Sequence, residues 1–153
     1  MDTELPLVLL VEDNPDDEVM VRRAMERTAA RAEMVVVHSG DAGLELVHGK
    51  NFAQTVPRLK LILLDQSLPG ISGPEVLKAI RNDRRTRMIP IVMLTSSEDE
   101  AALTTAYESG ANGYVRKPVD YNEFMKALEK SLAYWLGVNV PYPVPVPEGL
   151  FFG

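Results

Sequence analysis

The sequence predicts an α/β fold in which five parallel strands form one doubly wound sheet with helices on both faces. Short apolar runs, such as those that end at Val11 and Asp65, alternate with segments in which apolar residues keep helical spacing. The runs are continuous, which is typical of strands buried on both faces of a parallel sheet. Repeated strand–helix units favour this architecture because each crossover returns the chain to the same sheet.

The first helix is expected to start at Asn14, directly after the first strand. An Asn side chain caps a helix well, and a proline such as Pro15 is favoured in the first turn. Asp16 and Asp17 would then lie near the positive end of the helix dipole. Three strands are expected in this half of the chain, at residues 7–11, 34–37 and 60–65.

A short second helix is expected over residues 41–47, between the second and third strands. Ser39 or Asp41 would cap it, and Gly49 would end it. Residues 51–58 are expected to be a loop, which is long for a link between a helix and a strand.

The second half of the chain continues the alternation of strands and helices. Ser72 and Glu75 indicate the start of a third helix, and a charged turn over residues 83–88 follows it. Gly110 is expected in left-handed backbone at the end of a later helix. The remaining elements are a strand over 91–94, a helix over 98–109, a strand over 113–116 and a last helix from near Asp120, with helical spacing of Tyr121, Phe124, Met125, Leu128, Leu132 and Trp135.

Length, charge and composition restrict the class of protein. A chain of 153 residues fits one domain, and its net charge of −6 argues against a nucleic-acid-binding surface. Because the chain has no cysteine, disulfides and thiolate metal sites are excluded. The N-terminus has no basic segment and no apolar run reaches membrane-spanning length, so a soluble, cytoplasmic protein is expected.

Reactive side chains stand at the ends of four predicted strands, namely Glu12, Asp13, Asp65, Thr95 and Lys117. The carboxyl ends of parallel strands share one edge of the sheet, where ligands bind in open α/β folds. Three clustered carboxylates repel one another, and a hard divalent cation such as Mg²⁺ would relieve that repulsion. A carboxylate can also act as a nucleophile on phosphorus. Each of these residues taken alone could also be a helix cap, a turn residue or a solvated charge.

The full set of strand-end residues resembles the receiver domain of two-component response regulators. Leu68-Pro69-Gly70 after Asp65 and the run from Tyr114 to Pro118 complete the resemblance. It covers residues 5–136 and implies a flavodoxin-like sheet with strand order 2-1-3-4-5. Residues 137–153 would form a separate proline-rich C-terminal extension.

The resemblance also implies a phosphoryl acceptor and a metal site. Asp65 would accept a phosphoryl group from a sensor histidine kinase, with Mg²⁺ or Mn²⁺ as the cofactor. Asp13 and Asp65 would bind the metal directly, and Glu12 would act through a water. The backbone carbonyl of Ser67 would be a further ligand.

Other residues would stabilise the phosphoryl group and transmit the signal. By resemblance, Lys117 would offset phosphoryl charge, and Thr95 would donate its hydroxyl to a phosphoryl oxygen. Thr95 and Tyr114 would form a hydroxyl–aromatic switch, although Tyr114 could also be an ordinary aromatic at the sheet edge. Ser67 and Ser97 occupy the two positions that tune acyl-phosphate lifetime in this family, where many relatives carry Asn or an acid.

Signal output is expected through protein contacts. Leu103 and Tyr107 lie on one line of the helix over 98–109, and with Tyr114 they would form a homodimer or effector face, although scattered surface apolar residues are also normal. A closer resemblance is to stand-alone regulators of bacterial phytochrome histidine kinases, which are typically dimers. It is carried by the run Asn14 to Asp17, by the long loop before the third strand and by residues 134–136 before the proline-bearing tail.

Two alternatives to a phosphoacceptor receiver stay open. An aspartyl-phosphate phosphohydrolase also uses a strand-end Asp, but Ser67 stands where its second Asp is expected, so no enzyme is predicted beyond self-phosphorylation and self-dephosphorylation. A receiver-like adaptor that works without phosphorylation is the second.

The prolines over 141–147 favour polyproline II backbone, either as a flexible end or as a strap that packs on a domain. Leu150, Phe151 and Phe152 favour the strap.

Overall fold

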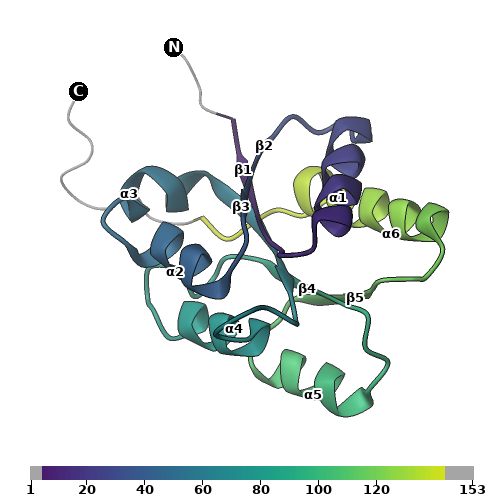
Figure 1. The fold of residues 1–153 in the computed structure, drawn as a ribbon. Coiled ribbons are helices and arrows are strands. Elements are labelled where there is room, and N and C mark those ends of the chain that lie inside the picture. Colours follow the sequence, from purple (N-terminus) through teal and green to yellow (C-terminus); the bar gives the residue numbers. More distant parts are fainter. Residues whose placement is uncertain (1–4, 144–153) are drawn as a thin grey trace.

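The computed structural model of the protein describes residues 5–143, and a five-stranded parallel sheet forms their centre (Figure 1). The strand order is β2-β1-β3-β4-β5, so the predicted fold class and strand order are confirmed. The strands are β1 (Leu7–Val11), β2 (Glu33–Val37), β3 (Leu59–Asp65), β4 (Ile91–Thr95) and β5 (Gly113–Arg116).

Helices cover both faces of this sheet. The α-helices are α1 (Pro15–Arg27), α2 (Gly40–His48), α3 (Phe52–Thr55), α4 (Gly73–Arg81), α5 (Glu100–Glu108) and α6 (Tyr121–Ala133). A 3₁₀ turn over Val56–Arg58 leads into β3, and a π-helical turn over Tyr134–Val138 extends α6. Helices α1 and α6 lie side by side on one face, while α2, α4 and α5 cover the other (Figure 1).

The core is divided by the sheet into two layers because successive strand side chains point to opposite faces. Val8 and Leu10 of β1 pack towards α1 and α6, whereas Leu9 and Val11 pack towards α2 and α4. Every residue of β1 and of β4 is buried, as the continuous apolar runs predicted.

The helix starts follow the capping residues of the sequence. The Asn14 side chain accepts hydrogen bonds from the backbone N–H groups of Asp16 and Asp17, and Ser39, rather than Asp41, caps α2. Ser72 and Glu75 form a complete capping box at the start of α4. Gly110 has a φ of +108°, which confirms the left-handed backbone predicted there.

Four expectations are corrected by the structure. Residues 51–58 are not a loop, because the apolar Phe52 and Val56 fold as α3 and a 3₁₀ turn, and Val56 is buried. Helix α5 starts at Glu100, two residues later than expected, since Asp99 caps it. Tyr121 keeps helical spacing but is exposed, and Trp135 belongs to the π-helical turn rather than to α6.

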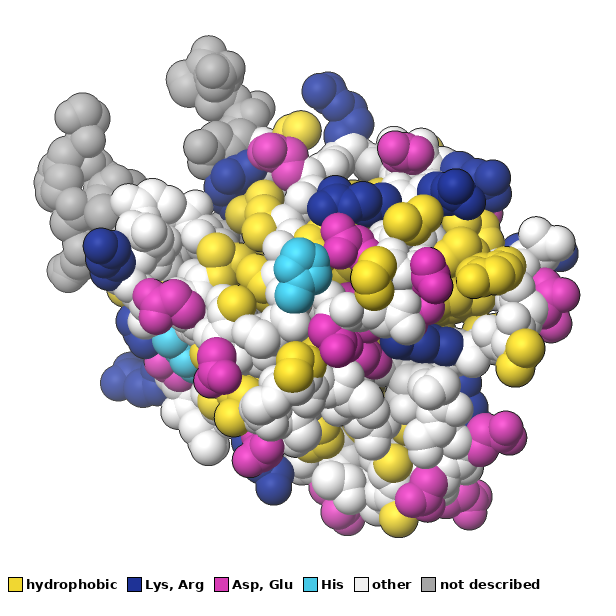
Figure 2. Space-filling model, in the orientation of Figure 1, with side chains coloured by type: hydrophobic (Ala, Val, Ile, Leu, Met, Phe, Trp, Pro, Cys, Tyr) yellow, Lys and Arg dark blue, Asp and Glu magenta, His cyan; other side chains and the backbone are white. Residues whose placement is uncertain are grey.

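The surface in view in Figure 2 carries interspersed acidic and basic side chains. No helix among residues 5–143 is both long and apolar enough to cross a membrane. Leu150, Phe151 and Phe152, on which the strap hypothesis depends, lie outside the described residues.

Candidate functional site

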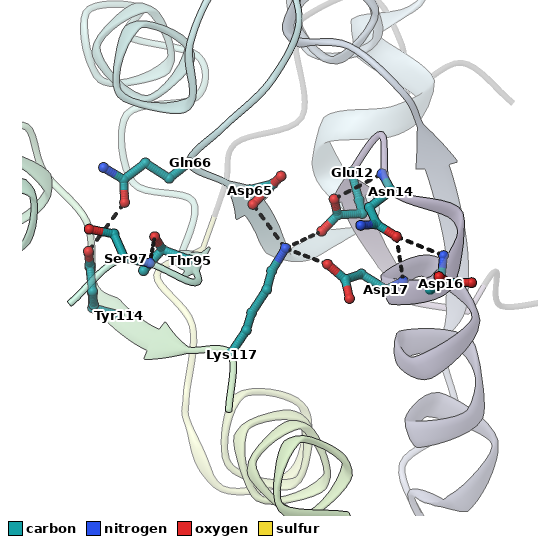
Figure 3. Close-up of polar contacts among 10 residues, drawn as sticks. All are labelled: Glu12, Asn14, Asp16, Asp17, Asp65, Gln66, Thr95, Ser97, Tyr114 and Lys117. Carbon is teal, nitrogen blue, oxygen red and sulfur yellow. Dashed lines mark hydrogen bonds and ion pairs between the residues drawn. The ribbon is translucent and has the colours of Figure 1, made fainter. Parts of the chain in front are cut away.

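The predicted site residues meet at the carboxyl edge of the sheet (Figure 3). Backbone hydrogen bonds extend the strands into the site: the N–H of Lys117 donates to the carbonyl of Thr95 at 2.6 Å, and that of Glu12 donates to Val37 at 3.0 Å. A Cβ at position 73 would collide with the carbonyl of Asp65, so Gly73 lets α4 start directly against the end of β3. Short connections therefore hold the reactive side chains on a rigid frame.

Three carboxylates form a cluster that fits a divalent cation. Glu12, Asp13 and Asp65 each offer an oxygen atom, and these atoms lie within 4.8 Å of one another. Glu12 and Asp65 are buried, whereas Asp13 is exposed. Burial raises the pKa of Glu12 to about 7, and the charge of Asp65 adds to the effect, against the hydrogen bond from Lys117. A hard cation with oxygen ligands would remove this cost of crowded negative charge.

The ammonium group of Lys117 is the central cation among the described residues of the site. Its Nζ donates to Asp17 at 2.8 Å, to Glu12 at 2.9 Å and to Asp65 at 3.1 Å. Burial alone would lower the pKa of Lys117, but the hydrogen bonds with Asp17 and Glu12 and the charge of Asp65 raise it above its usual range. Lys117 therefore stays charged. Its single positive charge faces four carboxylates: its three acceptors and Asp13.

Asp17 was not predicted as a site residue. Its position in the first turn of α1 suggested only an interaction with the helix dipole, yet its carboxylate reaches Lys117. The helix cap could have indicated this position. Because Asn14 starts α1 immediately after the end of β1, the first turn of the helix lies beside the site.

Neutral hydrogen bonds lie on the other side of Asp65. The Thr95 hydroxyl oxygen accepts from the backbone N–H of Ser97 at 3.0 Å. The phenol of Tyr114 donates to the side-chain carbonyl of Gln66 at 3.2 Å, and Figure 3 shows both groups at one end of the site. Gln66 was also not predicted, because its place after Asp65 suggested only a turn.

Two of the predicted interface residues, Tyr107 and Tyr114, form an aromatic pair on the same side. The rings of Tyr107 and Tyr114 are 6.3 Å apart between centroids. Tyr107 is 49% exposed and Leu103 is half-buried, so α5 presents an apolar surface next to β5. Ser67 is exposed in the loop after β3, and Ser97 is half-buried.

The chain is similar in sequence to known proteins. A model of the response regulator receiver domain matches residues 8–129. The probable methanogenesis regulatory protein FilR2 of Methanothrix harundinacea is 34% identical over 134 residues, which cover 87% of this chain and 85% of that protein. The response regulator Rcp1 of Synechocystis sp. is 30% identical over 130 residues, which cover 85% of this chain and 88% of Rcp1.

Solved structures give the same result. The Mn²⁺-bound form of Rcp1 superposes with a TM-score of 0.82 at 29% identity, covering 90% of this chain and 99% of that one. The bacteriophytochrome response regulator RtBRR has a TM-score of 0.69 at 36% identity, covering 95% of this chain and 86% of that one. Sequence and structure thus point to one family.

Proposed function

This chain belongs to the response regulator receiver domain family, and on that premise we propose that it accepts a phosphoryl group on Asp65 and signals through altered protein contacts. The observation that carries the proposal is the position of the Asp65 carboxylate, which shares one cluster with Glu12 and Asp13 and is hydrogen-bonded to Lys117. Such an oxygen can attack phosphorus while fixed charges stabilise the group that is transferred.

The metal site would consist of Glu12, Asp13 and Asp65, with the backbone carbonyl of Ser67 as a further ligand. A divalent cation bound there, Mg²⁺ or Mn²⁺, would offset the charge of the carboxylates and of the phosphoryl oxygens. The similar Rcp1 structure is of a Mn²⁺-bound form, which supports this choice of ion. The carboxylate cluster of this chain fits the same chemistry.

In the proposed transfer, an Asp65 oxygen forms a bond to phosphorus as the bond to a histidine nitrogen of the kinase breaks. Lys117 already donates to Asp65 at 3.1 Å, so its ammonium is placed to donate to a phosphoryl oxygen. The Thr95 hydroxyl would turn from its bond with Ser97 towards the same group. Receiver domains generally act as phosphoacceptors rather than enzymes, so only self-phosphorylation and self-dephosphorylation are expected.

Signal would leave the site through Thr95 and Tyr114. A shift of the Thr95 side chain changes the space beside Tyr114, whose phenol is bonded to Gln66 and whose ring faces Tyr107. Tyr114 thus connects the phosphoryl site with the surface of α5. The switch needs only a modest preference of the phosphorylated form for one position of the ring.

Partners are proposed from the same surface and from the relatives. Likeness to a protein named as a bacteriophytochrome response regulator supports a sensor histidine kinase of that class as the donor. Leu103, Tyr107 and Tyr114 are proposed to form a homodimer face, on which Tyr107→Asp should weaken self-association. Sedimentation velocity would measure it, and an unchanged profile would remove this face from consideration.

The test of phosphoacceptance is the intact mass of the protein after incubation with acetyl phosphate, with and without Mg²⁺. One Mg²⁺-dependent phosphoryl adduct is expected in the wild type and in the exposed control variant Asp41→Asn, and none in Asp65→Asn. An adduct of equal yield in Asp65→Asn would overturn the assignment. If no sample forms an adduct with acetyl phosphate, the experiment is repeated with a phosphohistidine donor. The absence of an adduct with both donors would favour the phosphorylation-independent adaptor.

A further inference from the structure

Lys117 gives all three of its N–H donors to carboxylates, and one of these acceptors lies outside the metal cluster. Glu12 and Asp65 belong to the cluster that fits a cation, whereas Asp17 comes from the first turn of α1. Asp17 makes the shortest of the three contacts, at 2.8 Å compared with 2.9 and 3.1 Å. The lysine is therefore shared between the metal cluster and a separate acid.

The position of Asp17 is fixed by the cap of α1. Its backbone N–H donates to the Asn14 side chain at 3.2 Å, and the backbone N–H of Asn14 donates to Glu12 at 3.1 Å. In Figure 3 the Lys117 ammonium lies between Asp65 on one side and Asp17 on the other. Asp16, in the same turn, is exposed, and its carboxylate is not one of the three acceptors.

We propose that Asp17 is a positioning residue that holds the Lys117 ammonium towards α1 and thereby keeps oxygens of Glu12 and Asp65 open to a divalent cation. The inference rests on the proposed phosphoacceptor function of this site. Without Asp17, the ammonium would have only Glu12 and Asp65 as charged acceptors and would bind them more closely. An entering cation would then compete with Lys117 for the same oxygens and meet its positive charge at shorter range.

The charge of Asp17 and its contact with Lys117 can be separated by a matched variant. Asp16→Asn removes one negative charge from the same helix turn but does not change an acceptor of Lys117. Because an exposed charge is screened by salt, this variant should change cation affinity by less than about twofold. Asp17→Glu keeps the charge and the acceptor group and serves as the conservative variant.

The experiment is calorimetric titration of the full chain with Mg²⁺ and with Mn²⁺, in the wild type and the three variants. Asp17→Asn should bind both ions about fivefold more weakly or worse, which is the lower range of coupling between linked sites. Asp17→Glu should recover most of the affinity. Equal weakening in Asp16→Asn and Asp17→Asn, or unchanged affinity in Asp17→Asn, would overturn the proposal.

A second readout needs no metal. In the metal-free wild type, the NMR chemical shifts of the Lys117 Hε protons and Nζ report the position of the ammonium. These shifts should change in Asp17→Asn, because the ammonium moves towards Glu12 and Asp65, but not in Asp16→Asn. Unchanged shifts in Asp17→Asn would contradict the positioning role. Failure of Asp65 phosphorylation in the wild type would remove the proposed function, yet both readouts would still report on Asp17. If Asp17→Asn does not fold, Asp17→Ser replaces it in the same titration, with the same expected weakening and the same Asp16→Asn control.

Discussion

The two sides of Asp65 differ in the kind of bond that they make. On the side of α1, Lys117 and the carboxylates of Glu12 and Asp17 form a partly buried ionic network. On the side of α5, the contacts of Tyr114 are a neutral hydrogen bond and a ring contact. Ionic contacts respond directly to an added phosphoryl charge, whereas neutral contacts on a partly exposed ring rearrange at small cost.

Packing differs between the same two sides. Helix α1 buries Met20, Val21 and Ala24 and packs along α6, which buries four residues of its own. Helix α5 buries only Ala106. Because regions with few buried apolar contacts open most easily, the proposed charge change at Asp65 would alter the surface at α5 more readily than at α1. In the proposed function, the well-packed side would sense the charge and the loosely packed side would respond.

Among variants that test the difference between the two sides of Asp65, Lys117→Met is expected to change the free energy of unfolding most. Removing this ammonium leaves Glu12 buried without its charged partner, which costs about 3 to 5 kcal/mol of unfolding free energy near pH 8 in comparable cases. The loss should shrink near pH 5, where Glu12 takes up a proton. Urea unfolding of metal-free protein at both pH values measures it, with exposed Lys126→Met as the control. An equal loss in both variants at pH 8 would show that the ionic network contributes no special stability.

The pH dependence of stability is the next effect in size. The pKa of Glu12 is raised from 4.5 to about 7 in the folded protein, so the folded state binds more protons than the unfolded state between these values. Stability from this group is complete below pH 4.5 and is lost as the pH rises to about 7, by up to about 3 kcal/mol. Glu12→Gln should flatten this dependence in unfolding experiments without divalent ions. A slope that persists in the variant would assign it to another group.

The smallest effect is expected on the neutral side, from Tyr114→Phe. The variant removes the hydrogen bond to Gln66 and keeps the ring contact with Tyr107, so the free energy of unfolding should fall by about 1 kcal/mol or less. Phosphoryl uptake, measured by intact mass, should stay at the wild-type yield, while the change in self-association on phosphorylation should decrease. Loss of phosphoryl uptake would place Tyr114 in the chemistry rather than in the response.

The fold and the strand-end residues were predictable because they depend on local patterns. Continuous apolar runs located the strands, and the rule that parallel strands end at one edge placed Asp65 near Lys117, 52 residues away. The capping residues Asn14 and Ser72 located two helix starts correctly.

The missed features depend on side-chain reach rather than on pattern. Asp17 and Gln66 follow predicted site residues closely in the chain, but nothing in their spacing shows which way their side chains extend. The short helix α3 was missed because its four residues are too few to show a helical period, and none of them is buried. Proposed roles such as that of the Ser67 carbonyl stay predictions.

The contact between Lys117 and Glu12 also has a consequence for the order in which the protein is made. These residues are 105 positions apart, and Lys117 follows β5, the last strand of the sheet and one of its edges. A growing chain that has reached only β4 would carry the acidic residues without the lysine. Closing a loop of this length is costly in chain entropy, so the contact forms after most local structure. The pairing of Lys117 with the acidic residues is therefore a late step of folding. C-terminal truncations before Lys117 should leave an acidic, incompletely folded sheet.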